Sequence, residues 1–346
     1  MQKEPLRILV IRTDRIGDIL LSTPVIKNLR LAYPDAYIAM MCRSYTLDIV
    51  KYNPYLNEVI AYDQDNLHKG WFSSMKFALM LGKKKFDLAL ILHPTNRAHI
   101  LAFFAGIPRR VGFDRKLPFL LTQKIKDTKF EGEKHEMEYA LDVLRAIGIE
   151  PKDKTPFMQI SKADDDWAIE FLKKNNVRDE ELLVAINPGA SCPSRRWPVE
   201  RFAEVADAII KEYNAKVLVI SGPEEVGLGE KVIRLMHYPA IDASGKTTVA
   251  QLAALLKHCK LIICTDTGPM HIAATFGASV IVMFGRNQRG LSPLRWGPLA
   301  KNSTILHKEV GCIECLAHNC TRGFKCLKAI TVEDVLSAVE EILKGP

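Results

Sequence analysis

The first group of residues that could do chemistry follows an apolar run and opens a helical pattern: Arg12-Thr13-Asp14-Arg15-Ile16-Gly17-Asp18. A dinucleotide site at such a turn needs G-x-G-x-x-G, and Gly17 is the only glycine present. The loop instead places the carboxylate of Asp18 beside Arg12 and Arg15, a combination suited to acid–base work on an acceptor. The simpler interpretation is that Asp14 or Asp18 caps the helix, and spacing alone favours it.

A second group stands where the apolar run Leu261–Cys264 gives way to a helical pattern: Asp266-Thr267-Gly268-Pro269-Met270-His271. Thr267 offers a hydroxyl, Gly268 lets a phosphate come close, and Pro269 suits the first turn of a helix. Because a helix N-terminus attracts negative charge, we expect an anion here. His271 either faces the same ligand or is packed, which is the commoner role of a single helical histidine.

The third group is again a loop between an apolar run and a helical pattern, with the sequences Asn187-Pro188-Gly189-Ala190-Ser191 and Ser194-Arg195-Arg196-Trp197-Pro198. Arg195 and Arg196 could grip a diphosphate through fork-shaped hydrogen bonds, and Ser191 adds a donor. The alternative is that one arginine is merely solvated. We interpret Trp197 as a core residue.

The elements that position these groups alternate between strand-length apolar runs and helical patterns. The alternation covers residues 6–113 and restarts over residues 182–284. Such alternation is typical of parallel sheets covered by helices. We therefore predict an α/β fold with two Rossmann-like, doubly wound halves, whose strand carboxyl ends face a central cleft.

A polar stretch from about residue 151 to residue 178 separates the halves. We place the domains at residues 1–165 and 166–330. A last helical pattern, Val332–Leu343, forms a third segment at 331–346, and it could pack back on the first half.

Composition narrows the class of protein. The 346 residues are 48% hydrophobic and 25% charged, which excludes disordered, collagen-like and coiled-coil proteins. The net charge is 48 − 40 = +8, so anionic partners are favoured. No apolar stretch reaches the roughly 18 residues that span a bilayer, and no secretory signal opens the sequence, so the expected location is cytoplasmic.

Four of the eight cysteines cluster near the end of the sequence: Cys312, Cys315, Cys320 and Cys326. Four thiolates can hold zinc in a tetrahedral structural site. The last two lack the C-x-x-C spacing of a typical zinc ribbon, so packed thiols and local disulfides are alternatives.

Four segments, in this order and at fitting intervals, resemble the bacterial lipopolysaccharide heptosyltransferases of glycosyltransferase family 9: Ile11–Pro24, Asn187–Pro198, Gly222-Pro223-Glu224-Glu225 and Asp266–His271. The resemblance spans nearly the whole chain, and the cysteine-rich segment is similar to that of the heptosyltransferase II branch. It implies a GT-B fold, with an N-terminal acceptor domain and a C-terminal nucleotide-sugar domain. It also implies inverting transfer of L-glycero-D-manno-heptose from ADP-heptose to the inner core of lipopolysaccharide, with no metal required.

The resemblance also implies roles for individual residues. Asp18 matches the general base, and Arg195 matches a lysine that contacts phosphates in relatives. Glu225 is similar to a carboxylate that meets the ribose, although Glu224 beside it leaves the register open. The remaining donor-binding candidates are Ser191, Asp266, Thr267, Gly268 and His271.

The implied acceptor is Kdo-lipid A or heptosyl-Kdo-lipid A, whose anionic groups suit basic residues such as Arg12 and Arg97. A peripheral contact with the inner face of the cytoplasmic membrane is also implied. Its candidate residues are aromatic, although such residues at helical spacing more often belong to a core: Trp71, Phe72, Phe103 and Phe104.

Three other functions compete with this interpretation. A related GT-B enzyme could use another donor or acceptor, because a fold does not fix a substrate. An NAD-dependent oxidoreductase is disfavoured by the missing glycine-rich motif. A nucleic-acid-binding protein is disfavoured because the basic residues are interspersed with acidic ones, so we expect no nucleic-acid partner.

Overall fold

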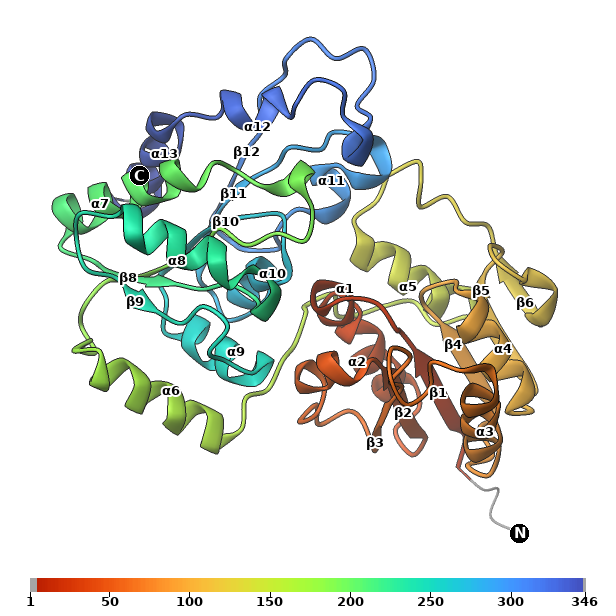
Figure 1. The fold of residues 1–346 in the computed structure, drawn as a ribbon. Helices are drawn as coiled ribbons and strands as arrows, with labels where there is room; N and C mark the ends of the chain where they lie inside the picture. Colours follow the sequence, from red (N-terminus) through yellow and green to blue (C-terminus); the bar gives the residue numbers. More distant parts are fainter. Residues whose placement is uncertain (1–4, 345–346) are drawn as a thin grey trace. The chain divides into compact units, whose positions relative to one another are not determined.

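The computed structural model describes residues 5–344, which divide into two compact units (Figure 1). The first runs to Phe130 and resumes at Lys134–Gln159, and the second comprises Glu131–Glu133 and the chain from Ile160 onward. The boundary that we predicted at residues 165 and 166 falls inside helix α6 (Lys162–Lys174), which lies in the second unit.

The first unit is built on a six-stranded parallel sheet in the order β3-β2-β1-β4-β5-β6. This is the strand order of a doubly wound Rossmann sheet. Its strands are β1 (Arg7–Ile11), β2 (Tyr37–Cys42), β3 (Glu58–Ala61), β4 (Leu88–Ile91), β5 (Arg109–Phe113) and β6 (Gln123–Ile125). Sequence analysis did not predict β6, because its three residues, Gln-Lys-Ile, form no apolar run.

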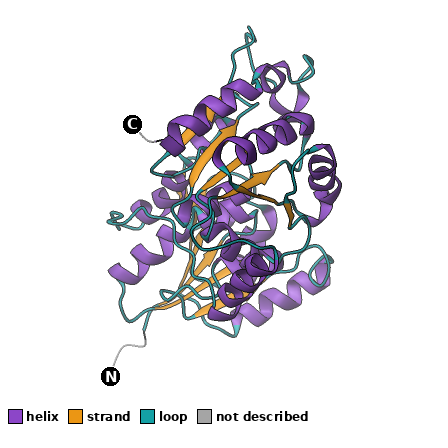
Figure 2. Cartoon of the chain, turned by 90° about the vertical axis from the view of Figure 1, so that its left-hand side faces the viewer, coloured by secondary structure: helices purple, strands orange, loops and turns teal. Residues whose placement is uncertain are grey.

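Helices cover both faces of this sheet, as the purple and orange elements of Figure 2 show. One pair, α3 (Trp71–Gly82) and α4 (Asn96–Phe104), packs together over a core that includes Phe77, Leu81 and Leu101. The other helices are α1 (Ile16–Leu20), α2 (Thr23–Ala32) and α5 (Glu136–Ala146), of which α2 and α5 pack together.

The helical pattern that follows the first apolar run forms two helices, α1 and α2, rather than one. Pro24 lacks the N–H that would continue the hydrogen-bond ladder to Leu20. The Leu20 carbonyl instead accepts from the hydroxyl of Thr23 at 2.7 Å. The chain therefore bends just after Asp18, and α1 is a short helix that carries this carboxylate in its first turn.

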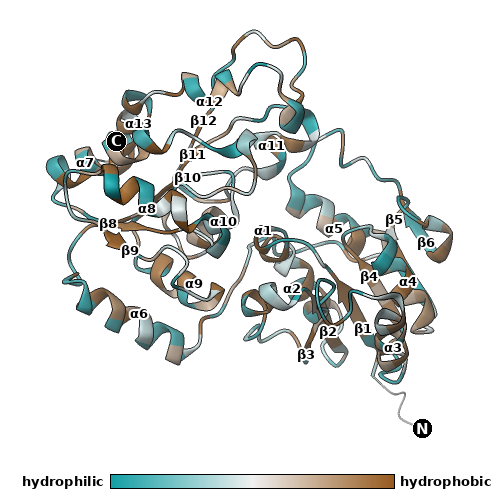
Figure 3. Ribbon diagram, viewed as in Figure 1, coloured by the Kyte–Doolittle hydropathy of each residue, from teal (hydrophilic) through white to brown (hydrophobic). Residues whose placement is uncertain are grey.

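The second unit repeats the winding, with a parallel sheet in the order β12-β11-β10-β7-β8-β9. Its central strands are fully buried and strongly hydrophobic (Figure 3). The strands are β7 (Leu183–Asn187), β8 (Lys216–Val219), β9 (Ile241–Asp242), β10 (Leu261–Thr265), β11 (Ser279–Met283) and β12 (Ser303–Leu306).

The core of this unit lies between the sheet and three helices: α7 (Val199–Tyr213), α8 (Val226–Leu235) and α13 (Val332–Lys344). Helices α9 (Val249–Lys257) and α10 (Gly268–Thr275) pack together, and α9 also packs against α6. Two short helices, α11 (Pro293–Trp296) and α12 (Lys325–Ala329), follow β11 and β12.

The final helix belongs to the core of the second unit. Its buried residues Val335, Ala338 and Val339 join this core, and α13 packs against α7. Among residues 5–344, no helix is both long enough and apolar enough to cross a membrane.

Candidate functional site

The predicted site residues lie where each sheet reverses its winding. In the first unit β1 and β4 are neighbours, and in the second β7 and β10 are neighbours. Connections leave such a pair of strands in opposite directions, so their carboxyl ends leave a crevice that binds ligands in open α/β sheets. The loops that carry Asp18, Arg195 and Asp266 all follow one of these four strands.

Asp18 is buried at the start of α1 and has two kinds of partner. Its Oδ1 accepts a hydrogen bond from Nη2 of Arg12 at 2.9 Å. Its Oδ2 accepts from the backbone N–H of Arg15 at 3.3 Å, which is the helix-capping contact that the simpler interpretation predicted. Capping uses one oxygen and leaves the Arg12 contact intact, so the two interpretations of Asp18 are compatible.

Arg12 is the centre of a buried cluster of charges. Its side chain is 1% exposed, and its Nε lies 2.8 Å from Oδ1 of Asp14. Its Nη2, besides contacting Asp18, lies 3.0 Å from Oε1 of Glu136, the first residue of α5. Burial alone would lower the pKa of Arg12, but the charges of these three carboxylates raise it above its usual value. Arg12 is therefore a permanent cation.

The same surroundings make Asp18 a stronger base than an ordinary carboxylate. Burial, followed by the negative charge of Asp14, raises the pKa of Asp18 to about 7, although Arg12 acts in the opposite direction. A general base works best when its pKa is near the pH at which it operates. Asp18 thus has the protonation chemistry that removal of a hydroxyl proton requires.

Arg97, which we predicted to bind the acceptor, forms hydrogen bonds with neighbouring residues of the first unit. Its guanidinium donates to the carbonyls of His68 and Lys69, at 2.9 and 2.7 Å, and to the hydroxyl of Tyr62 at 3.2 Å. No hydrogen bond or ion pair found among residues 5–344 links Arg97 to Arg12 or Asp18. The structure gives Arg97 a role in holding the segment between β3 and α3.

In the second unit the predicted loops meet through direct bonds. The side-chain amide of Asn187 donates to the hydroxyl of Thr267 at 2.9 Å, and Arg195 donates to the carbonyl of Asp266 at 3.0 Å. A Cβ added to Gly189 would lie 3.5 Å from Cβ of Glu225, so the loop after β8 also lies beside the loop after β7. Glu225 is half-buried whereas Glu224 is exposed, which favours Glu225 as the residue that faces the site.

The start of α10 has the local structure that the sequence indicated. Thr267 is the extended residue before the helix, and Gly268 and Pro269 form its first turn. His271, one turn further, is buried. Ser191 is exposed in the loop after β7. Trp197 is confirmed as a core residue, since its indole N–H donates to the carbonyl of Ile330 at 3.0 Å inside the core cluster.

Sequence reasoning missed Arg286. This residue follows β11, its side chain is 1% exposed, and it forms an ion pair with Oδ2 of Asp266. Arg195 approaches the same oxygen, with its Nε at 3.6 Å. Burial lowers the pKa of Arg286. Its position one residue beyond Gly285, at the carboxyl end of a buried strand, was the available signal.

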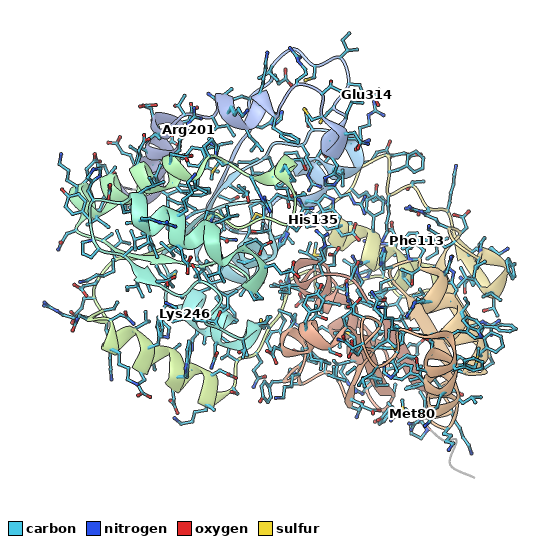
Figure 4. All side chains as sticks on the ribbon, in the orientation of Figure 1. Met80, Phe113, His135, Arg201, Lys246 and Glu314 are labelled. Carbon is cyan, nitrogen blue, oxygen red and sulfur yellow. The ribbon has the colours of Figure 1, made fainter. Side chains whose placement is uncertain are left out.

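The cysteine-rich segment packs beside these loops, near Glu314 in Figure 4. The thiol of Cys326 donates to the carbonyl of Gly285 at 3.0 Å, and the N–H of Asn287 donates to the sulfur of Cys315 at 3.3 Å. His318 links the loop after β7 to the loop after β11. Its two ring nitrogens lie 3.0 Å from Oγ of Ser194 and 3.5 Å from Nη1 of Arg286.

The predicted zinc site is not supported. Within residues 5–344, no group of three or more His, Cys, Asp or Glu side chains is arranged to hold a metal ion. The four cysteines, Cys312, Cys315, Cys320 and Cys326, are free thiols. Cys326 is close enough to Cys315 and Cys320 for their charges to add to the effect of burial, which raises its pKa. The contacts of Cys326 and Cys315 with the loop after β11 are the hydrogen bonds given above.

Two doubly wound parallel units in one chain are the architecture of GT-B glycosyltransferases, and that is the class of protein to which this fold corresponds. The family profile of glycosyltransferase family 9 (heptosyltransferase) matches residues 74–325. The chain therefore belongs to this family.

Individual relatives agree with this assignment. Lipopolysaccharide heptosyltransferase 3 of Escherichia coli K12 is 28% identical, over 94% of this chain and 95% of its own. The crystal structure of a glycosyl transferase family 9 protein from Veillonella parvula is 27% identical, covers 99% of both chains and has a TM-score of 0.87. The structure of ADP-heptose lps heptosyltransferase II from E. coli has a TM-score of 0.80 at 23% identity, covering 98% of this chain and 99% of its own.

Proposed function

We propose that this chain transfers L-glycero-D-manno-heptose from ADP-heptose to the inner core of lipopolysaccharide, with inversion at the anomeric carbon. Membership in a heptosyltransferase family supports the class of reaction. The observation that carries the mechanism is the buried carboxylate of Asp18, whose surroundings raise its pKa to about 7. Relatives whose names specify lipopolysaccharide and ADP-heptose support the choice of substrates.

In this proposal the second unit binds the donor. Arg195 and the N-terminus of α10, with Thr267 and Gly268, hold the diphosphate, because cations and free N–H groups favour a leaving group that gains negative charge. Glu225 contacts the ribose, and His271 and Ser191 complete the donor site. Asp266 contacts the heptose hydroxyls while Arg286 holds its Oδ2.

The first unit binds the acceptor. Asp18 takes the proton of the acceptor hydroxyl as that oxygen forms a bond to the anomeric carbon and the bond from this carbon to the diphosphate oxygen breaks. ADP leaves with the electron pair. Arg12 keeps Asp18 in place and adds positive charge that suits an acceptor bearing carboxylates and phosphates. Protein cations and helix N–H groups stabilise the leaving group, so we propose that catalysis needs no metal.

A peripheral contact with the inner face of the cytoplasmic membrane completes the proposal. The four predicted aromatic residues are exposed rather than part of the core, and Phe72 is 89% exposed. They lie on α3 and α4, where the ring of Phe104 meets those of Trp71 and Phe103 edge-on. Exposed lysines flank them and α3 has no acidic residue, a combination suited to an anionic lipid surface: Lys69, Lys76 and Lys83.

Calorimetric titration with ADP, ADP-heptose, UDP, GDP and NAD, all with EDTA present, tests the proposed donor. We expect selective binding of ADP and ADP-heptose. Preference for UDP or GDP would keep the fold and change the donor, and binding of NAD alone would support the oxidoreductase alternative.

A further inference from the structure

Glu136 is a buried carboxylate that no motif in the sequence singles out. It is the first residue of α5, directly after His135, which is labelled in Figure 4, and it is 1% exposed. Its Oε1 lies 3.0 Å from Nη2 of Arg12, the same nitrogen that donates to Asp18. One guanidinium nitrogen therefore serves two carboxylates.

A second cation contacts the same oxygen of Glu136. Nζ of Lys129 lies 3.2 Å from Oε1 of Glu136 and also donates to the carbonyl of Leu92 at 3.0 Å. The Lys129 side chain is 6% exposed. A buried charge is tolerated only when it is paired, so the cluster is built around these pairings. Glu136 is shared between two cations, and Nη2 of Arg12 is shared between two carboxylates.

We propose that Glu136 is a positioning residue that, by sharing Arg12 with Asp18, sets how strongly Asp18 attracts the proton of the acceptor hydroxyl. This inference rests on the proposed function, because it assumes that Asp18 is the base. Lys129 has the opposite effect. Because Lys129 also pairs with Glu136, Glu136 attracts Arg12 less strongly, and the positive charge of Arg12 acts more strongly on Asp18.

The direction of each effect follows from the charges. The charge of Glu136 itself raises the pKa of Asp18, and the charge of Arg12 lowers it. Removing Glu136 takes away the first effect and leaves Nη2 of Arg12 to Asp18 alone, so both changes lower the pKa of Asp18. Removing Lys129 ties Glu136 to Arg12 more closely and raises that pKa. The charged and titratable groups that face Asp18 are Arg12, Asp14, Glu136, His93 and Tyr45.

The experiment is the pH profile of kcat/KM for transfer from ADP-heptose, measured by ADP release with the full-length chain. We expect the acidic limb of the profile to move down by about one pH unit in Glu136→Gln. In Lys129→Met the limb moves up. The control is Glu138→Gln, on the same helix, whose carboxylate pairs with Arg145 and Lys154; this variant should leave the limb in place.

Opposite shifts cannot arise from a general loosening of the fold, which would lower the rate without moving the limb in two directions. Thermal unfolding followed by circular dichroism checks that each variant is folded, since Glu136 and Lys129 both lie in the first unit. An unmoved limb in both variants, or shifts in the same direction, would overturn the inference. The proposed function fails separately, if Asp18→Asn keeps its activity.

Discussion

Asp18 and Glu136 accept hydrogen bonds from the same nitrogen of Arg12, at 2.9 and 3.0 Å. One carboxylate comes from the loop after β1 and the other from the start of α5. This long-range pairing keeps three charges buried together at the carboxyl end of the first sheet. The pKa of Asp18 is raised despite its contact with Arg12, because burial and the charge of Asp14 outweigh the arginine, and the charge of Glu136 adds a smaller effect.

Replacing Asp18 by Asn should reduce the transfer rate by about 10²–10⁴-fold, the usual contribution of a general base. The change keeps the shape of the side chain and removes its ability to take a proton. Initial rates of ADP release measure the effect. ADP binding by calorimetry, which reports on the second unit, should stay within about twofold. Turnover near the original rate would reduce Asp18 to a helix cap.

The same substitution should change how the stability of the fold depends on pH. A carboxyl whose folded pKa is raised contributes stability that is complete below its unfolded pKa of about 3.9. That contribution is lost as the pH rises to about 7, because the buried group must then ionise. Asp18→Asn has no such loss, so its Tm relative to the original chain should increase between pH 4 and pH 8. A Tm difference that is constant or falls over this range would contradict the raised pKa.

Arg195 and Arg196 provide a matched pair for the donor site. Arg195 contacts Asp266, whereas the exposed Arg196 donates to the carbonyl of Ala190. We expect Arg195→Ala to weaken ADP binding about 10–100-fold, the effect of losing hydrogen bonds to a charged group. Adenosine binding should change little, because it lacks the diphosphate. The assignment fails if Arg196→Ala weakens ADP binding as much as Arg195→Ala does.

The exposed aromatic residues can be tested with vesicles. The double variant Trp71→Ser, Phe72→Ser should bind vesicles that contain anionic phospholipid at least about fivefold more weakly, since two large apolar side chains can no longer enter the interface. Leu235→Ser, which removes an exposed apolar residue from α8, serves as the control. Equal sedimentation of both variants with the vesicles would argue against α3 and α4 as the contact.

Much of this arrangement follows from local sequence patterns. The apolar runs predict the central strands of both sheets, and the helical pattern that follows Pro198 corresponds to α7. Parallel strands place the loops that follow them at one edge of the sheet, which is why Arg195 and Asp266 could be expected to meet. In such cases a short segment of sequence is sufficient to predict the structure it forms.

Other features depend on contacts between distant segments. Glu136 and Arg286 lie in segments without a recognisable motif, and only the folded chain shows their ion pairs with Arg12 and Asp266. The spacing of the cysteines suggested a metal, but among residues 5–344 their side chains form no group arranged to hold one. Aromatic residues such as Phe72 were more easily interpreted as core, because helical spacing does not reveal whether a partner covers them.

The most direct test of the account is heptose transfer itself. The purified chain is incubated with ADP-heptose and EDTA, and with either Kdo-lipid A or heptosyl-Kdo-lipid A, and the acceptors are analysed by mass spectrometry. The account predicts that one acceptor gains a single heptose, with one ADP released for each heptose transferred. Release of ADP without heptose on either acceptor, or no reaction until a divalent metal is added, would contradict it.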